Sequence, residues 1–581
     1  MLHQVVEYAR RQDLAAEPGF APKDARWAVL CTRQGAYLGL VELGDTSLKK
    51  NSGHHFLKAP DFSFSDMKAG GVTKSHFLIE TAGVVAGYGK DAPEEKHRYF
   101  VSLLKRASEV MPALEGAAKV LQSDDAIAHL RSDFETQKAK ATDKTTFQID
   151  GEFPVESDEW HAWWREFRRG LQTGRDQGRK HADAKLVCFL TGEVVEPAAT
   201  HPKIKGLTSV GGLAMGDVLI GFKQESFRSY GLEQSANAAM SELAAKGYQA
   251  GLNDLIASHS ALLAGTLVAH WFRSPIREEE DPMDAIMGPS ETEGLNAQIR
   301  ARKLLDSIRS GERPDLANNT YYALTLSSNG GRVIIRDWME GSFEELVTNV
   351  DRWFSDLEIV QRDGGGSARP SKLAAVLGAL VRDLKDVAAP MVARLYQVAV
   401  SGELVPFAAM AQALARVRID VIQGERPNHA RMGIIKAYHL RKWRKGKDAM
   451  EEQLKPGLNA EFQDRAYQCG RLMAVLAKLQ LADNPDVKAG VVQRYYAAAS
   501  TTPALVFGRL IRGAQIHLNK LTEKRGLAVW YDRQITEICC KIGTSMPATL
   551  NLVDQSLFAL GYYQQQAALW AGKGKNEKED E

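Results

Sequence analysis

A glycine-rich stretch at residues 364–371, with the sequence GGGSARPS, separates two parts of the chain that have different patterns. Three adjacent glycines followed closely by a proline disfavour both helix and strand, so this stretch is typical of a linker. Most of the sequence after it has the apolar spacing of helices, whereas the sequence before it also contains β-rich runs. A chain of 581 residues is also longer than one domain of roughly 100–200 residues. The sequence therefore predicts several domains, with a division near residue 365.

Two β-hairpins are predicted before the glycine-rich stretch. The apolar runs 27–31 and 36–43 are separated by the short polar segment 32–35. The runs 321–327 and 332–338 flank Asn329-Gly330-Gly331, in which Asn-Gly can supply the positive φ angles of a tight turn. Both patterns indicate antiparallel sheet.

An amphipathic helix is predicted between the hairpins. Ser157 is the expected N-cap, and large apolar residues follow it at helical spacing: Trp160, Trp163, Trp164, Phe167 and Leu171. We expect these tryptophans to pack in a core rather than to stack on bases.

After residue 371, two apolar faces have helical spacing. The first consists of Tyr467, Leu472, Val475, Leu476 and Leu479, and the second of Leu505, Leu510 and residues 516–518. The predicted fold is therefore α+β. Its parts are a mixed α/β body with β-hairpins at 1–365, a linker with connecting helices at 366–430, a helical bundle at 431–572 and a disordered charged tail at 573–581.

The net charge of +2 hides an uneven distribution. Residues 431–581 hold 23 Lys and Arg against 15 Asp and Glu, whereas residues 1–430 hold 51 against 57. A basic helical unit favours a polyanionic partner, because phosphate contacts release counterions whatever the base sequence. Helices whose cations are only solvated are the alternative interpretation.

Cysteine usage and hydropathy indicate the cellular location. The five cysteines are scattered, and none forms a C-x-x-C pair, which favours reduced thiols in a cytosol over a zinc module. The first residues lack a secretory signal, and no apolar run reaches the ~18 residues of a membrane span. We expect a soluble, cytoplasmic protein without a membrane partner.

Two segments partly resemble sequence motifs of enzymes, but neither has the residues or the spacing that the motif requires. Residues 70–75, GGVTKS, resemble a P-loop, yet Lys68 and Thr73 occupy the positions where that motif needs glycine. Asp61, Asp66 and Lys68 resemble the metal site of a nuclease, but four residues between the carboxylates are too few for two adjacent strands. We expect no catalytic residue, no metal and no cofactor; a metal-dependent DNA nuclease using these three residues is the alternative.

Several strings, spread in order over nearly the whole chain, together resemble one family: the large subunit of the type I-C CRISPR Cascade, a crRNA-guided surveillance complex. They lie at residues 68–91, 188–206, 222–241, 319–346, 467–480 and 495–521. The first reads KAGGVTKSHFLIETAGVVAGYGKD and the fourth reads NTYYALTLSSNGGRVIIRDWMEGSFEEL.

The resemblance implies a non-catalytic subunit of an antiviral ribonucleoprotein complex. Such a subunit recognises a protospacer-adjacent motif (PAM) in duplex DNA, promotes strand opening and R-loop formation, stabilises the displaced strand and supports recruitment of a helicase-nuclease. The implied partners are the crRNA, contacted on its 5′-end side, the target double-stranded DNA, and the backbone, crRNA-processing and small helical subunits. The small subunit would arise from an internal start, for which Met432 and Met450 are candidates.

Two sets of residues are predicted to contact nucleic acid. For PAM recognition, a thin glycine loop with nearby donors suits a DNA groove, and the candidates are Lys49, Lys50, Asn51, Lys68, Gly70, Gly71, Lys74, Ser75 and His76. For the displaced strand, a basic run around a tryptophan suits phosphates and a stacked base, and the candidates are Arg441, Lys442, Trp443, Arg444, Lys445, Lys447, Arg471, Arg494, Arg509 and Arg512. A purely architectural subunit, whose basic helices meet acidic proteins, is a further alternative.

Overall fold

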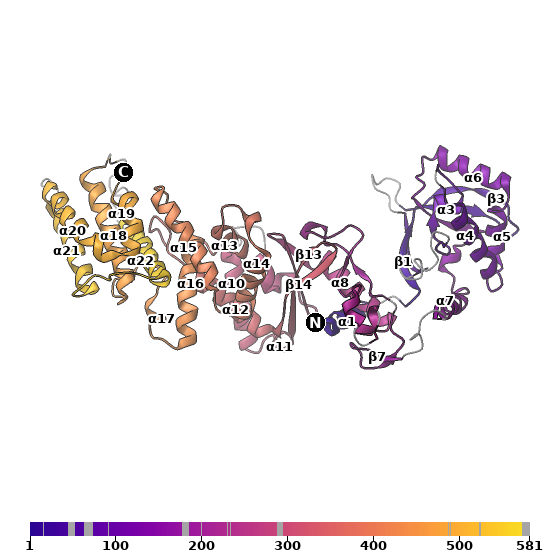
Figure 1. The fold of residues 1–581 in the computed structure, drawn as a ribbon, viewed down its shortest axis with the longest axis horizontal. Helices are drawn as coiled ribbons and strands as arrows, with labels where there is room; N and C mark the ends of the chain where they lie inside the picture. Colours follow the sequence, from indigo (N-terminus) through magenta and orange to yellow (C-terminus); the bar gives the residue numbers. More distant parts are fainter. Residues whose placement is uncertain are drawn as a thin grey trace. The chain divides into compact units, whose positions relative to one another are not determined.

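The computed structural model confirms the α+β fold and divides the chain into two compact units (Figure 1). It describes residues 1–14, 17–44, 53–62, 74–90, 92–176, 185–198, 200–228, 231–232, 234–287, 294–485, 487, 490–521 and 525–571. The first unit comprises residues 1–205 and 215–254, and the second comprises residues 206–214 and 255–581. The predicted tail at 573–581 lies outside the described residues.

The first unit contains a four-stranded sheet in the order β3 (Tyr37–Glu42), β2 (Trp27–Cys31), β6 (Lys144–Ile149) and β5 (Glu80–Thr81). β2 and β3 form the predicted antiparallel hairpin, and β2 pairs with β6 in parallel. Four of the five β2 residues are buried, as expected of a central strand covered on both faces. The helices between β5 and β6 are α3 (Ala82–Val85), α4 (Glu94–Ala107), α5 (Ala113–Val120) and α6 (Asp124–Thr136).

A two-stranded antiparallel ribbon lies beside helix α7 (His161–Asp176) in the same unit. The ribbon consists of β1 (Phe20–Ala25) and β4 (His54–Pro60). Trp160 and Trp164 are fully buried, and their indole N–H groups donate to the carbonyls of Pro154 (2.9 Å) and Gly19 (2.6 Å). These contacts confirm that the tryptophans belong to a core.

The start of α7 differs from the prediction. The helix begins at His161, and Ser157 instead follows a short 3-10 helix, η1 (Pro154–Glu156). The Ser157 hydroxyl accepts a hydrogen bond from the backbone of Glu159 at 3.2 Å. Ser157 therefore shapes the turn before the helix rather than capping the helix.

The first unit is completed by α1 (Leu2–Arg11), most of α8 (Glu242–Ser258), which ends in the second unit, and short elements between residues 186 and 238. The strand pairs are β7 (Leu186–Val187) with β8 (Val194–Val195) and β9 (Lys203–Ile204) with β10 (Asp217–Val218). The short helices are η3 (Glu225–Arg228) and η4 (Gln234–Ala238). A hydrogen bond of 2.6 Å from the Tyr8 hydroxyl to Asp254 joins α1 to α8.

The second unit begins with an antiparallel meander of β11 (Ser260–Leu263), β12 (Thr266–Phe272), β13 (Thr320–Asn329) and β14 (Arg332–Ser342). A turn joins β13 to β14 as predicted, but its positive φ angles lie at Gly330 (58°) and Gly331 (82°), one residue later than the predicted Asn329-Gly330 pair. Around it lie η2 (Thr208–Val210), η5 (Glu278–Glu280), α9 (Pro282–Met287), α10 (Gly294–Arg309), α11 (Pro314–Ala317) and α12 (Phe343–Leu357). Ser342 caps α12 by accepting from the backbone of Glu345.

Helices make up the rest of the second unit, in the orange to yellow part of the ribbon (Figure 1). They are α13 (Leu373–Leu380), η7 (Leu384–Asp386), α14 (Ala389–Ser401), α15 (Phe407–Ile422), α16 (His429–Gly446), α17 (Met450–Gln453), α18 (Arg465–Asp483), α19 (Val491–Thr501), α20 (Pro503–Lys520), α21 (Arg525–Ile542) and α22 (Leu552–Ala571). One hydrophobic core runs through this unit from Leu263 to Tyr563.

The predicted division near residue 365 does not coincide with the division of the structure. Residues 358–372 form no helix, as expected, but Gly364 packs so closely on α22 that a Cβ there would collide with Ala567 and Ala571. The segment 366–430 contains helices, as predicted, but α13, α14 and α15 contribute to the shared core and do not merely connect two domains.

Of the two apolar helical faces predicted from the sequence, one is buried and the other is partly exposed. All five apolar residues predicted for α18 are buried. On α20, however, Leu505 is 81% exposed and Ile516 is 59% exposed, because the buried face consists of Val506, Phe507, Leu510 and Ala514. The prediction of a buried face through Leu505 and Ile516 was therefore wrong.

Candidate nucleic-acid interface

Most of the residues predicted to recognise duplex DNA lie outside the described part of the chain. These are Lys49, Lys50, Asn51, Lys68, Gly70 and Gly71. Lys74, Ser75 and His76 are described. Ser75 is fully buried, so its hydroxyl is not accessible to DNA in this conformation, and His76 is partly buried.

A polar cluster joins the two flanks of segment 63–73. The Lys23 ammonium lies 3.1 Å from an Asp61 carboxylate oxygen and 3.2 Å from Nδ1 of His76. It also donates to the carbonyl of Pro60 at 2.8 Å. The Phe62 ring lies 6.2 Å from the His76 ring, measured between centroids. The residues before and after segment 63–73 are therefore held side by side.

Electrostatics explain why this cluster is stable. Burial, helped by the charge of Lys23, lowers the pKa of His76 to about 4, so its ring is neutral at pH 7. Burial alone would raise the pKa of Asp61, but attraction by Lys23 and Lys246 outweighs it and keeps that pKa below its usual value. The ionised Asp61 thus acts as an anchor between two lysines.

The same geometry bears on the alternative of a nuclease. Asp61 oxygens lie 3.1 Å from Lys23 and 3.9 Å from Lys246, so ammonium groups already stand where a metal would bind. Asp66 and Lys68, the other two residues of that hypothesis, lie outside the described residues.

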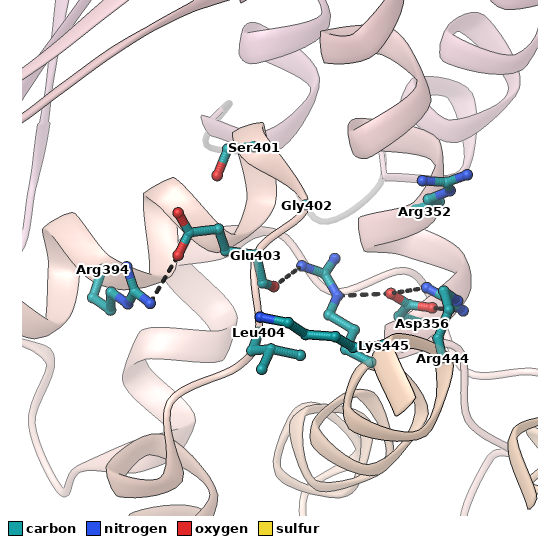
Figure 2. A pocket seen from close by; sticks show the side chains of 10 residues that line it. Arg352, Asp356, Arg394, Ser401, Gly402, Glu403, Leu404, Arg444 and Lys445 are labelled. Carbon is teal, nitrogen blue, oxygen red and sulfur yellow. Dashed lines mark hydrogen bonds and ion pairs between the residues drawn. The ribbon is translucent and has the colours of Figure 1, made fainter. Parts of the chain in front are cut away.

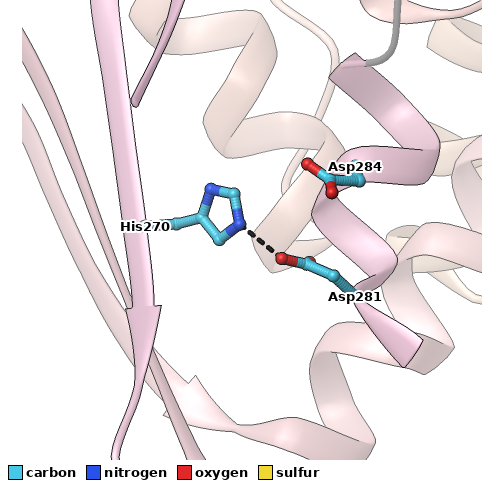
Figure 3. Close-up of side chains that lie close together, drawn as sticks. All are labelled: His270, Asp281 and Asp284. Carbon is cyan, nitrogen blue, oxygen red and sulfur yellow. Dashed lines mark hydrogen bonds and ion pairs between the residues drawn. The ribbon is translucent and has the colours of Figure 1, made fainter. Parts of the chain in front are cut away.

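Within the described residues, one group has the composition of a metal site: His270 on β12 with Asp281 and Asp284 at α9 (Figure 3). The His270 Nε2 lies 2.6 Å from an Asp281 oxygen. Burial lowers the pKa of His270, but attraction by Asp281 outweighs it and raises that pKa above its ordinary value. The group could hold a divalent cation, yet the histidine and Asp281 already satisfy each other as an ion pair.

Two arginines predicted to bind the displaced strand are engaged inside the protein. Arg441 on α16 is 4% exposed, and its Nε donates to Asp356 on α12 at 2.7 Å. Arg444 lies 2.9 Å from the other oxygen of Asp356 and 2.5 Å from Glu451. Both arginines therefore already have carboxylate partners within the protein.

Trp443 and Arg471 also have internal partners. Trp443 is partly buried against the core, with ring centroids 5.2 Å from His439 and 6.0 Å from Phe462. Arg471 is buried on α18, and its Nε donates to Gln565 on α22 at 2.8 Å. Packing therefore accounts for both side chains.

The other predicted cations of this set are exposed: Lys442, Lys445, Lys447, Arg494, Arg509 and Arg512. Within the described residues, their side chains form no hydrogen bond or ion pair. Arg509 and Arg512 share one face of α20 with the exposed Leu505 and Ile516, because these positions are spaced 4, 3 and 4 residues apart. This set can contact phosphates without breaking an internal ion pair.

Sequence reasoning missed a basic pocket formed by α12, α14 and α16 (Figure 2). It has a volume of about 530 Å³, and its charged lining residues are Arg352, Asp356, Arg394, Glu403, Arg441, Arg444 and Lys445. Only the α16 residues belong to a basic run in the sequence. Arg352 and Arg394 come from other helices, so no local pattern could have indicated that they converge here.

These observations describe an α+β protein with polar anchors beside β1 and β4 and exposed cations on its C-terminal helices. A scan of protein families matches residues 2–570 to the CRISPR-associated protein family Cas_Csd1. The chain belongs to this family, and it is therefore a CRISPR-associated Cascade subunit. A search of curated proteins found no match. No helix in the described ranges has an apolar stretch long enough to cross a membrane.

Proposed function

We propose that this chain is the non-catalytic large subunit of a type I-C Cascade complex. In this proposal it recognises the PAM in target duplex DNA, promotes strand opening and stabilises the displaced strand, while a recruited helicase-nuclease supplies cleavage. The single observation that carries the proposal is the family match over residues 2–570. The ordered strings that resemble the type I-C large subunit support the subtype.

The polar cluster around Lys23 supports a recognition role for segment 63–73. A loop that reads base edges needs fixed flanks and a thin tip, so that its donors meet the groove without a large ordering cost. Asp61 and His76 fix the flanks through Lys23. The sequence between them contains Lys68, Gly70 and Gly71, which suit a thin, basic tip.

The two predicted PAM-reading segments flank one strand. Lys49, Lys50 and Asn51 precede β4 in the sequence, and the stretch from Lys68 to His76 follows it. A strand of the seven residues His54–Pro60 is about 20 Å long. In our proposal one of the two stretches positions the DNA through phosphates and the other reads bases.

Binding to PAM-bearing duplex tests the proposal. We expect Lys68→Ala combined with Lys74→Ala, in the assembled complex, to weaken binding of PAM-bearing duplex by about tenfold, since two cations are removed from the proposed site. Binding of single-stranded target complementary to the crRNA should not change, because such a target needs no duplex opening.

A matched variant controls for net charge. Lys105→Ala with Lys140→Ala removes two exposed lysines from the same unit and should leave duplex binding as it is. Equal affinity of the Lys68/Lys74 variant and the unaltered complex would remove this segment from the proposed site. The non-catalytic role fails if the purified chain cuts DNA with Mg²⁺ and Asp61→Ala abolishes the cleavage.

A further inference from the structure

The basic pocket on α12, α14 and α16 has an excess of positive charge. Its five cations face two carboxylates, Asp356 and Glu403. Arg394 pairs with Glu403 at 2.8 Å (Figure 2), and Asp356 is shared by Arg441 and Arg444. Arg352 and Lys445 have no side-chain ion pair within the described residues, and both are exposed. A surplus of cations that converge on one concavity attracts an anion.

Arg441, which lines this pocket, has unused hydrogen-bonding capacity. A guanidinium carries five N–H groups. The Nε of Arg441 donates to Asp356, and its Nη1 donates to the carbonyls of Val398 (2.6 Å) and Glu403 (2.7 Å). Its Nη2 is buried and has no hydrogen-bond partner within the described residues. Two N–H groups of a 4% exposed arginine are therefore left over, although buried donors normally have partners.

The pocket is also rigidly built. Asp356 and two main-chain carbonyls hold Arg441 in one position, and its guanidinium lies 6.0 Å from the centre of the Trp353 ring. Asp356 is itself 3% exposed and lies on α12, whose buried face packs in the main core. A cation held in place in this way loses little side-chain entropy when it binds a ligand.

We infer that this pocket binds a phosphoryl group. Arginine forks match phosphate oxygens in geometry as well as in charge, and a volume of about 530 Å³ falls within the roughly 300–1,000 Å³ of small-ligand sites. The phosphoryl group belongs either to a nucleic-acid strand or to a free phosphorylated molecule. The inference does not require the proposed function, because the pocket is distant in sequence from the predicted PAM segments.

Titration of the full-length chain with pyrophosphate tests the inference, and a short single-stranded oligonucleotide tests the source of the phosphoryl group. We expect saturable binding of at least one probe by calorimetry at constant ionic strength. Arg352→Ala with Lys445→Ala should weaken that binding by about tenfold or more, because charge-assisted hydrogen bonds to the anion are removed. Binding of pyrophosphate indicates a free phosphorylated ligand, and binding of the oligonucleotide alone indicates a strand.

Two further variants make the outcome decisive. Arg382→Ala with Lys303→Ala removes two exposed cations that do not line the pocket and should leave affinity unchanged. Glu403→Gln removes a carboxylate that repels anions and releases Arg394, so it should tighten binding severalfold, an effect that a folding defect cannot imitate. Absence of saturable binding for both probes, an equal loss in the control variant, or weaker binding by Glu403→Gln would overturn the inference.

Discussion

Individual cations on α16 differ in role although they are adjacent in sequence. Arg441 and Arg444 turn toward Asp356, whereas Lys442 and Lys445 are exposed. Composition alone could not separate the two pairs, since all four residues belong to one basic run. Helical periodicity indicated that Arg441 lies on the buried face of α16, because Ile434, Ala437 and Arg441 are spaced 3 and 4 residues apart and all are buried. The partner Asp356 lies 85 residues away, so no local pattern could indicate it.

A neighbouring histidine on α16 leads to a prediction about pH. His439 is buried, its Nε2 lies 2.7 Å from the Ser556 hydroxyl, and burial lowers its pKa to about 3. Above pH of about 6.5, neither the folded nor the unfolded chain protonates this ring, and it has no effect. Below that pH the unfolded chain takes up a proton that the folded chain does not, so the free energy of unfolding falls.

When the pH falls from about 7 to about 5.5, the free energy of unfolding of the unaltered chain should decrease. In the His439→Gln variant we expect this decrease to be smaller by about 1 kcal/mol. Urea unfolding at the two pH values, followed by helical circular dichroism, measures the difference. Parallel pH profiles for the two proteins would show that the ring is already protonated in the folded state.

At the scale of elements, sequence patterns predicted correctly those elements that depend on contacts between residues close in sequence. The β2–β3 and β13–β14 hairpins were predictable, because a turn sequence and the flanking runs determine each of them. The division of the chain into units was not predictable, because α12 and the helices after residue 372 share a core whose contacts span long stretches of sequence. The buried face of α20 was misassigned for the same reason: its neighbours decide which apolar residues are covered.

The crossing of α18 and α22 depends on two glycines. A Cβ at Gly470 would collide with the carbonyl of Phe558, and one at Gly561 would collide with the carbonyl of Tyr467. We expect Gly470→Ala to lower the free energy of unfolding by about 1–3 kcal/mol, because the helices must move apart. Chemical unfolding of the full chain measures this change.

Gly508 on α20 is the matched control for this substitution. It is exposed, and a Cβ there would meet no heavy atom within 4 Å. Gly508→Ala should therefore stabilise the chain by about 0.5–1 kcal/mol through helix propensity alone. Destabilisation by both substitutions would contradict the packing explanation.

At the scale of the whole molecule, the family could be identified from the sequence, while the candidate site was only partly predictable. The ordered strings and the match over residues 2–570 agree on a CRISPR-associated subunit. The segregated charge indicated the basic helices, but the three-dimensional arrangement divides their cations into paired and exposed sets. The pocket that contains Arg352 and Arg394 exists only after folding.

The exposed set leads to a prediction about salt. We expect Arg509→Gln with Arg512→Gln to reduce the slope of log affinity for single-stranded DNA against log salt by about 0.7 for each phosphate that the chain no longer neutralises. Fluorescence anisotropy across a series of NaCl concentrations measures the slope. Arg309→Gln with Arg332→Gln, two exposed arginines outside the helices α16–α22, should leave it unchanged; an equal change in both variants would assign the effect to net charge.

The anchoring of Asp61 and His76 by Lys23 has a consequence for the length of chain between them. Because Lys23 holds Asp61 and His76 together, a change in the number of residues between them has only a small entropic cost of loop closure. A change of length between these two residues should therefore leave the pairing of β1 with β4 intact.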